Sequence, residues 1–143
     1  MDGPSHFHTQ KGYELAGGSP LTAAMEDYLE MLCRLCSTEG FTRVHLLAER
    51  LNVQPSSASK MVDGLKREGL VRAEKYGLLR LTPRGEEVGR YLLYRHGVLH
   101  RALCLLNHTD SELEQTERIE HFIDRRTVEN LARLLEQHDA PPR

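Results

Sequence analysis

A short stretch near the C-terminal end, Glu117-Arg118-Ile119-Glu120-His121, brings chemically active side chains together. If it is helical, Glu117, Glu120 and His121 stand at positions i, i+3 and i+4 and lie on one face. Carboxylates so close repel one another unless a cation neutralises them. Oxygen and imidazole ligands suit manganese, iron(II) or zinc better than copper(I), so this is a candidate site for a divalent metal. A solvated helix face that happens to be polar is the alternative, and the rest of the chain must decide.

The composition describes a soluble globular protein with one ordinary domain, or two small ones that share a core. Of the 143 residues, 39% are hydrophobic and 28% are charged. No apolar run reaches membrane-spanning length and no signal peptide opens the chain. We therefore expect a cytoplasmic protein with no membrane partner.

The net charge of −2 conceals an uneven distribution of charge. Residues 43–84 contain nine basic and four acidic side chains, whereas residues 110–139 contain nine acidic and four basic ones. A basic segment suits nucleic acid and an acidic one suits cations. We therefore expect a nucleic-acid face and a cation face on the same molecule.

Two cysteines, Cys33 and Cys36, have the spacing of a redox or zinc motif. A zinc site would need two more ligands at similar spacing, and in a helix both thiols fall among apolar residues. We interpret them as small core residues. Residues 1–20 are rich in glycine and proline and predict a mobile arm, in which His6 and His8 are ordinary surface residues.

The first predicted helix carries two more acidic candidates. Thr22 is expected to cap it and Glu39-Gly40 to end it. Asp27 and Glu30 stand at i, i+3, on a side that partly diverges from the apolar stripe. Taken alone, they are equally well explained as acids that the helix dipole favours near an N-terminus.

A long helix is predicted from Thr82-Pro83 to about residue 106, with threonine as the cap and proline in the first turn. It carries His96 and His100 one turn apart. After a break at residues 107–109, Asp110 is expected to cap the helix that bears the Glu117–His121 stretch. A last amphipathic helix is expected over about residues 126–137.

Between these helices lies the pattern of a helix-turn-helix. Thr42 is expected to cap a short helix over residues 44–51, and after a tight turn Pro55 opens a second helix. The N-terminal part of the second helix is where base edges are reached. Polar side chains there could be mere capping residues, but in this layout we assign DNA contacts to Ser56, Ser57, Ser59 and Lys60.

A hairpin is predicted directly after the second helix, with strands at residues 71–75 and 78–81 around a glycine turn. A hairpin in that place is the wing of a winged helix. Its Lys75, Tyr76 and Arg80 are expected to contact DNA phosphates, which position a protein without specifying sequence.

The whole pattern resembles the diphtheria-toxin-repressor family, and in particular its manganese-sensing branch. The likeness extends from about Leu21 to His138. It rests on four stretches that match closely, which are residues 25–30 (MEDYLE), 54–62 (QPSSASKMV), 93–96 (LYRH) and 119–121 (IEH).

The resemblance implies a set of six metal ligands: Asp27, Glu30, His96, Glu117, Glu120 and His121. The iron-sensing branch has methionine at position 27 and cysteine at position 117, and carboxylates there make the site harder and favour Mn²⁺. Two Mn²⁺ ions per subunit are expected, with Fe²⁺, Zn²⁺ or Cd²⁺ as possible substitutes. His100 stands where relatives usually carry an acid, so the sequence leaves undecided whether the chain has an ancillary metal site of the iron-sensing type.

The fold expected is mostly α, with an arm (1–20), a winged helix-turn-helix (21–82) and a helical dimerisation and metal-binding domain (83–143). No SH3-like domain of the kind found in many iron sensors is expected. The resemblance implies a homodimer whose recognition helices match successive major grooves of a palindromic operator. Apolar dimer contacts are expected after Pro83, from Leu92, Leu93, Leu99, Leu103, Leu131 and Leu135.

The function predicted is a manganese-responsive repressor of metal-uptake genes, in which the metal reduces the ordering cost of DNA binding. An iron(II)-responsive regulator is the nearest alternative. A winged-helix regulator of an organic ligand would need an apolar pocket. A dinuclear metalloenzyme would need an open coordination position beside a substrate pocket, and it gives no reason for a winged helix. We therefore expect neither an enzyme nor a small organic substrate.

Overall fold

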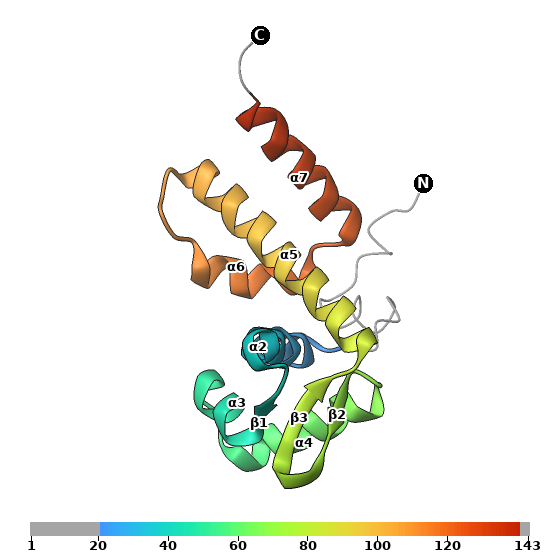
Figure 1. Cartoon of the computed structure of the whole chain (residues 1–143). Helices are drawn as coiled ribbons and strands as arrows, with labels where there is room; N and C mark the ends of the chain where they lie inside the picture. The colour runs from blue at the N-terminus through green and yellow to red at the C-terminus, as the bar shows by residue number, and fades with distance from the viewer. Residues whose placement is uncertain (1–20, 141–143) are drawn as a thin grey trace, which may run out of the picture.

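The computed structural model describes residues 21–140, and most of this part of the chain is helical. Figure 1 shows helix α2 (Ala23–Glu39) between two groups of elements, with α3, α4 and a small sheet on one side and α5, α6 and α7 on the other. The mostly helical fold predicted from the sequence is confirmed. The predicted arm with His6 and His8 lies outside the described residues.

Local signals fix both ends of α2. The Thr22 side chain accepts a hydrogen bond from the Met25 amide at 3.1 Å, as an N-cap should. Gly40 adopts the left-handed conformation with φ 83° and donates its N–H to the Cys36 carbonyl at 2.8 Å. α2 buries Leu29 and Leu32 almost completely and thereby forms the centre of the main core.

The predicted helix-turn-helix consists of α3 (Val44–Leu51) and α4 (Pro55–Arg67). Asn52, in the left-handed conformation at φ 57°, ends α3 and turns the chain. Both helices bury one apolar face against α2, with Leu47 and Leu65 fully inaccessible. Burial of this kind stabilises the unit without any ligand.

The prediction that Thr42 caps α3 was wrong. The N-cap is Arg43, which makes no side-chain capping bond, and Thr42 lies in a short strand, β1 (Thr42–Arg43). β1 pairs antiparallel with a later strand, in which Leu79 lies opposite Thr42, 37 residues further along the chain. Long-range pairing of this kind leaves little trace in local sequence.

The predicted wing is formed by β2 (Val71–Ala73) and β3 (Leu78–Leu81), joined through a 3-10 turn, η2 (Lys75–Gly77). The sheet order is β1-β3-β2, and both pairings are antiparallel. The wing is thus a three-stranded sheet anchored to the start of α3, rather than a free hairpin.

The long helix α5 (Pro83–Asn107) extends from the wing into the second group of helices (Figure 1). Thr82 caps it as predicted, since its hydroxyl accepts the Gly85 N–H at 3.0 Å. Gly85 is required because a Cβ there would lie 2.0 Å from the Leu70 carbonyl oxygen. At Gly89 a Cβ would lie 3.2 Å from Cys33, so α5 and α2 pack closely.

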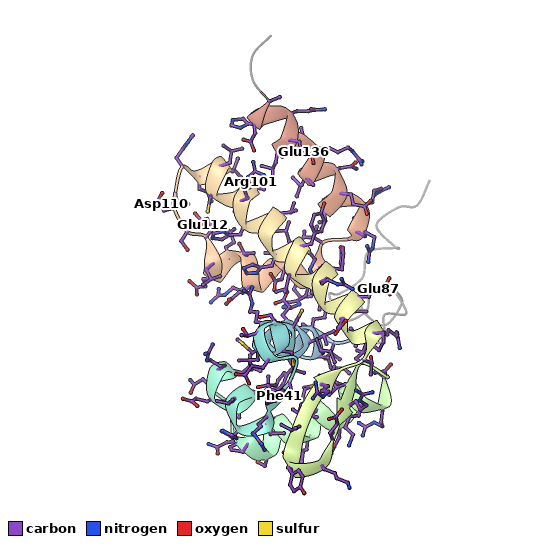
Figure 2. The ribbon with its side chains drawn as sticks, in the orientation of Figure 1. Phe41, Glu87, Arg101, Asp110, Glu112 and Glu136 are labelled. Carbon is purple, nitrogen blue, oxygen red and sulfur yellow. The ribbon has the colours of Figure 1, made fainter. Side chains whose placement is uncertain are left out.

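α6 (Leu113–Ile119) continues directly into a 3-10 turn, η3 (Glu120–Phe122). The prediction that Asp110 caps this helix was wrong, because the N-cap is Glu112 and α6 begins only at Leu113. The Glu112 carboxylate accepts bonds from the Asn107 and Thr109 side chains and so shapes the loop. Figure 2 labels Asp110 and Glu112 in this region between α5 and α6.

The last helix, α7 (Arg125–Asp139), begins at an Asp124 cap and packs along α5. Leu92, Leu99 and Leu135, which were predicted to make dimer contacts, are at most 5% exposed within the single chain. That part of the dimer prediction was wrong, because the same apolar faces are used to pack the chain on itself. None of the described helices is long and apolar enough to cross a membrane.

Candidate metal centre and DNA-binding surface

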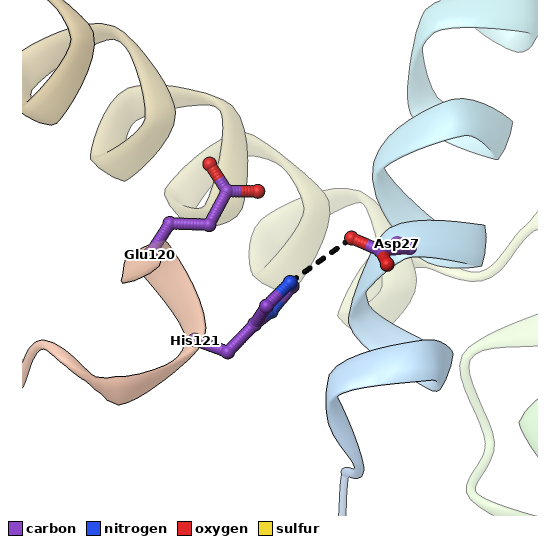
Figure 3. Close-up of side chains that lie close together, drawn as sticks. All are labelled: Asp27, Glu120 and His121. Carbon is purple, nitrogen blue, oxygen red and sulfur yellow. Dashed lines mark ion pairs between the residues drawn. The ribbon is translucent and has the colours of Figure 1, made fainter. Parts of the chain in front are cut away.

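Side chains from three separate segments meet where α2, α5 and η3 come together. Two groups each have ligand atoms within 4.8 Å of one another. We call Asp27, Glu120 and His121 the His121 cluster, and Glu30, His96 and Glu120 the His96 cluster. Glu120 belongs to both, and Figure 3 shows it beside His121 with Asp27 opposite on α2.

The His96 cluster contains buried carboxylates that lack hydrogen-bond partners. His96 Nδ1 lies 2.7 Å from Glu120 Oε2, while Glu120 Oε1 and Glu30 Oε1 have no partner among the described residues. Burial, and then repulsion from Glu120, raises the pKa of Glu30 to about 8, and burial also raises the pKa of Glu120. Buried carboxylate oxygens without a donor are unfavourable until a proton or a cation neutralises them, and this set of oxygens with an imidazole fits a divalent metal.

The His121 cluster is held by hydrogen bonds on both sides of the imidazole. His121 Nε2 lies 3.1 Å from Asp27 Oδ1, the contact drawn as a dashed line in Figure 3, and Nδ1 lies 2.9 Å from Glu26 Oε1. Burial of the ring lowers its pKa, but the bonds to Asp27 and Glu26 outweigh burial and raise the pKa of His121 to about 10. The imidazolium therefore supplies the positive charge that a bound cation would replace.

The sixth predicted ligand, Glu117, belongs to neither cluster and is exposed. It lies in α6, whereas Glu120 and His121 lie in the 3-10 turn. Because the helix type changes between them, the three residues do not share the single α-helical face that the sequence predicted. Glu117 does line a cleft of about 410 Å³ together with Asp27 and His96. Five of the six predicted ligands are thus in the clusters, and the sixth faces the same cleft.

Sequence reasoning missed two residues beside the clusters, Glu26 and Arg95. Arg95 is 4% exposed, and its guanidinium contacts both Glu26 oxygens, at 3.1 and 3.5 Å. One signal in the sequence could have revealed Arg95, because it falls between Leu92 and Leu99 on the buried stripe of α5. A charged residue in such a place needs a buried partner.

His100 contributes to neither cluster. Its Nε2 accepts the backbone N–H of Glu112 at 3.1 Å, and its ring stacks on His96 with centroids 6.1 Å apart. His100 therefore ties the start of α6 to α5.

The DNA-binding prediction for α4 concerns side chains that the structure leaves exposed. Ser56, Ser57, Ser59 and Lys60 all face solvent, while Ala58 and Val62 between and after them are buried. The N-cap, Gln54, makes no side-chain capping bond. Within residues 21–140 the serines form no side-chain hydrogen bond, so their hydroxyls are available to an external partner.

In the wing, Lys75 is exposed and Tyr76 at the tip is 86% exposed, with its backbone in the left-handed region at φ 64°. Arg80, also predicted to contact phosphate, is engaged within the chain. It lies 3.0 Å from Glu74 Oε2, donates to the Gly40 carbonyl at 3.3 Å and sits over the Phe41 ring.

Comparisons with known proteins agree with this architecture. Residues 20–79 match the family described as "Iron dependent repressor, N-terminal DNA binding domain". The chain is similar to the HTH-type transcriptional regulator MntR of Lysinibacillus sphaericus (strain C3-41), with 35% identity over 122 residues. This match covers 85% of the chain and 88% of the relative.

Among solved structures, the manganese regulator SloR matches with a TM-score of 0.71 and 30% identity, covering 81% of this chain. ScaR with bound Zn²⁺ matches with a TM-score of 0.67 and 26% identity, covering 78% of this chain. The chain spans about half the length of these structures, 55% of SloR and 53% of ScaR. From the sequence match to MntR, the matched repressor domain and the shared fold, we conclude that the chain belongs to the diphtheria-toxin-repressor family, on its MntR-like branch of transcriptional regulators.

Proposed function

We propose that this protein is a manganese-responsive DNA-binding transcriptional repressor of metal-uptake genes. The observation that carries the proposal is the pair of buried, unpartnered oxygens on Glu30 and Glu120, at the junction of the winged helix and the helical half. The names of its relatives, a transcriptional regulator MntR and a manganese regulator SloR, support the same function.

The donor set favours manganese. The ligands are Asp27, Glu30, His96, Glu117, Glu120 and His121, which offer only oxygen and imidazole nitrogen. Such hard ligands suit Mn²⁺, and Fe²⁺, Zn²⁺ and Cd²⁺ are possible substitutes. Two clusters that share Glu120 support two ions per subunit. A divalent cation would neutralise the negative charge of these carboxylates.

The position of the ligands supplies the regulatory step. Asp27 and Glu30 lie on α2, which packs directly on α3 and α4, whereas Glu120 and His121 lie in η3. Carboxylates from both sides repel one another when they are ionised and unneutralised. Neutralising them removes this repulsion and so favours one arrangement of the DNA-binding half (21–82) relative to the helical half (83–143).

DNA recognition is assigned to the exposed side chains of α4 and the wing. Ser56, Ser57, Ser59 and Lys60 would reach base edges in the major groove, with Lys75 and Tyr76 on phosphates. Arg80, which is already paired with Glu74, would shape the wing and contact DNA only secondarily.

A homodimer on a palindromic operator follows from the usual symmetry of such regulators. Two exposed leucines support a contact surface on the helices far from the wing. Leu106 at the end of α5 is 73% exposed and Leu134 on α7 is 61% exposed. They take the place of the buried Leu92, Leu99 and Leu135. The other predicted leucines are half-buried and stay candidates for the interface, namely Leu93, Leu103 and Leu131.

The test is DNA binding by protein stripped of metal with a chelator and then given each divalent metal in turn. Because the operator sequence is not given by the structure, the DNA for this test is first selected from a random pool with the manganese-loaded protein. We expect Mn²⁺ to raise the affinity at least tenfold, and the selected sequences to be palindromic. Equal binding with and without metal would contradict the proposal, and activation by Fe²⁺ alone would favour the iron-responsive alternative.

A further inference from the structure

Glu26 lies beside the ligand Asp27 on α2 but has different contacts. Its carboxylate receives the Arg95 guanidinium from α5 and the His121 imidazole from η3. Its side chain is only 15% exposed. Three elements that meet at the metal centre therefore meet at this carboxylate too, although Glu26 is not among the six assigned ligands.

The two nitrogens of His121 have separate partners. Nδ1 is 2.9 Å from Glu26 Oε1, and Nε2 is 3.1 Å from Asp27 Oδ1. With Nδ1 committed to Glu26, only Nε2 can face Asp27 and Glu120. Histidines that bind metals usually donate the other ring N–H to a carboxylate or carbonyl, which fixes the ring and its tautomer.

Arg95 explains why Glu26 remains available for this bond. The guanidinium is buried on α5, and Glu26 is the carboxylate that the structure pairs with it. Contacts from the guanidinium to both carboxylate oxygens fix the orientation of the Glu26 side chain. Held in this way, Glu26 Oε1 lies against His121 Nδ1, and Glu26 does not line the cleft.

The His96 cluster has no equivalent support within residues 21–140. His96 Nδ1 contacts Glu120, which is itself a member of the cluster, and the ring stacks on His100. The two clusters therefore differ in how their histidines are held, one by a carboxylate outside the cluster and one by a carboxylate inside it.

We propose that Glu26, held by Arg95, is a positioning residue that directs His121 Nε2 into the His121 cluster and so selectively supports the metal ion bound there. This inference rests on the proposed function, because it assumes that the clusters bind metal. It predicts that loss of Glu26 weakens one of the two metal-binding events and spares the other.

The experiment compares full-length wild-type protein with Glu26→Gln and Glu26→Met. Free Mn²⁺ is followed by electron paramagnetic resonance during titration of metal-stripped protein. Wild-type protein should bind two ions. In Glu26→Met the affinity of one ion should fall about 10- to 100-fold, the range for a lost partner of a metal-binding histidine. Glu26→Gln should lie between, because its amide oxygen still accepts the Nδ1–H bond. Glu87→Gln, an exposed carboxylate on α5 (Figure 2), is the matched control and should behave as wild type.

A second measurement reads the ring directly. In ¹⁵N-labelled wild-type protein loaded with Cd²⁺, the His121 Nδ1–H signal should persist and the Nε2–H signal should disappear. In Glu26→Met the Nδ1–H should lose its protection from exchange with water. Loss of the Nδ1–H signal and retention of the Nε2–H signal in the wild type would overturn the proposal.

Stability is controlled with the double variant Glu26→Met/Arg95→Met, since Glu26→Met alone leaves a buried arginine unpaired. The double variant should fold and should show the same selective loss of one ion. Two unchanged sites in the variants, or equal weakening of both, would overturn the role of Glu26. If wild-type protein bound no Mn²⁺, the proposed function would fail instead.

Discussion

The helix-turn-helix with its wing and the metal-ligand clusters differ in what they bury. In α3 and α4, Leu47 and Leu65 are fully buried and the polar side chains assigned to DNA face solvent. At the clusters, Glu120 is fully buried beside Glu30, and both carry an unpartnered oxygen. The helix-turn-helix is stabilised by apolar burial, whereas the clusters place carboxyl groups that repel one another in a buried position.

This difference separates stability from response. Exposed residues of α4 can change with little effect on folding, because apolar burial holds that region. A change in the clusters alters both stability and the effect of metal, since the buried carboxylates are unfavourable until they are neutralised.

The largest effect is expected where the two regions join. Gly85→Ala would place a Cβ 2.0 Å from the Leu70 carbonyl oxygen, so the start of α5 must move away from the segment that leads from α4 into β2. We expect a loss of about 3 kcal/mol or more in the free energy of unfolding, measured by urea denaturation. The matched control is Gly97→Ala on the same helix, where nothing lies within 4 Å of the added Cβ. It should be neutral or stabilising by up to about 1 kcal/mol. Similar losses in both variants would contradict the close approach at Gly85.

The second prediction separates stability from metal response within the clusters. Glu120→Gln removes the buried carboxylate that both clusters share, and burial raises the pKa of that carboxyl. Without metal at pH 8, the variant should be more stable than wild type by about 1 kcal/mol. The affinity for Mn²⁺ should fall at least about 100-fold, since loss of a mere supporting partner already costs 10- to 100-fold, and the enhancement of DNA binding by Mn²⁺ should be lost with it. Glu114→Gln, an exposed acid on α6, should change neither quantity. A variant that lost stability without metal would show that the carboxylate is not in conflict with its surroundings.

The same contrast explains which features could be predicted from the sequence. Thr22 and Thr82 cap the N-termini of α2 and α5, and Gly40 ends α2, as predicted. These positions could be predicted because capping depends on residues only three or four positions away. Thr42 and Asp110 were assigned wrongly because the pairing with Leu79 and the bonds of Glu112 decide those ends. Helices that capping and periodicity define were predictable, whereas ends set by tertiary contacts were not.

At the site, the candidate ligands were found by residue type and by resemblance to a family, but their support was not. Glu26 and Arg95 are 69 residues apart, and Glu26 and His121 are 95 apart. No local spacing reports such contacts. The change from α-helix to 3-10 turn after Ile119, which separates Glu117 from the other two residues of its stretch, was equally invisible.

The third prediction concerns pH and the metal-free protein. The pKa of Glu30 is raised from 4.5 to about 8, and that of His121 is raised from 6.5 to about 10. Both groups bind protons more tightly in the folded state. The stability that Glu30 contributes is therefore complete below about pH 4.5 and is lost as the pH rises through 8, and that of His121 is lost between about 6.5 and 10. We expect the melting temperature to fall by about 5–10 °C between pH 5 and pH 8.

With Mn²⁺ in excess, this trend should reverse, because metal binding requires deprotonated ligands and so grows stronger as the pH rises. Melting curves with and without Mn²⁺ across this range test both statements. Glu30→Gln should flatten the metal-free curve over the lower part of the range and leave the fall above pH 7. A metal-free melting temperature that rises from pH 5 to pH 8 would contradict the assignment of buried carboxyl groups to the clusters.

The smallest effects are expected on the DNA-binding surface, where single contacts are exposed. Lys60→Ala and Ser57→Ala should weaken binding to the selected operator by roughly fivefold and binding to random DNA much less, since they are assigned to base edges. Lys75→Ala should weaken binding to both DNAs alike and reduce the slope of log affinity against log salt by about one. Fluorescence anisotropy at several salt concentrations measures all of these quantities. Equal losses on both DNAs for all three variants would remove Ser57 and Lys60 from sequence reading.

Arg80→Ala serves as the contrast to Lys75→Ala within the wing. Arg80 contacts Glu74, the Gly40 carbonyl and the Phe41 ring, whereas Lys75 has no ion pair among residues 21–140. We therefore expect Arg80→Ala to lower the melting temperature by a few degrees, because it loosens the wing from the end of α2. Lys75→Ala should leave the melting temperature unchanged. If Arg80→Ala instead behaved as Lys75→Ala does, with full stability and a reduced salt slope, its guanidinium would leave Glu74 for a phosphate when DNA binds.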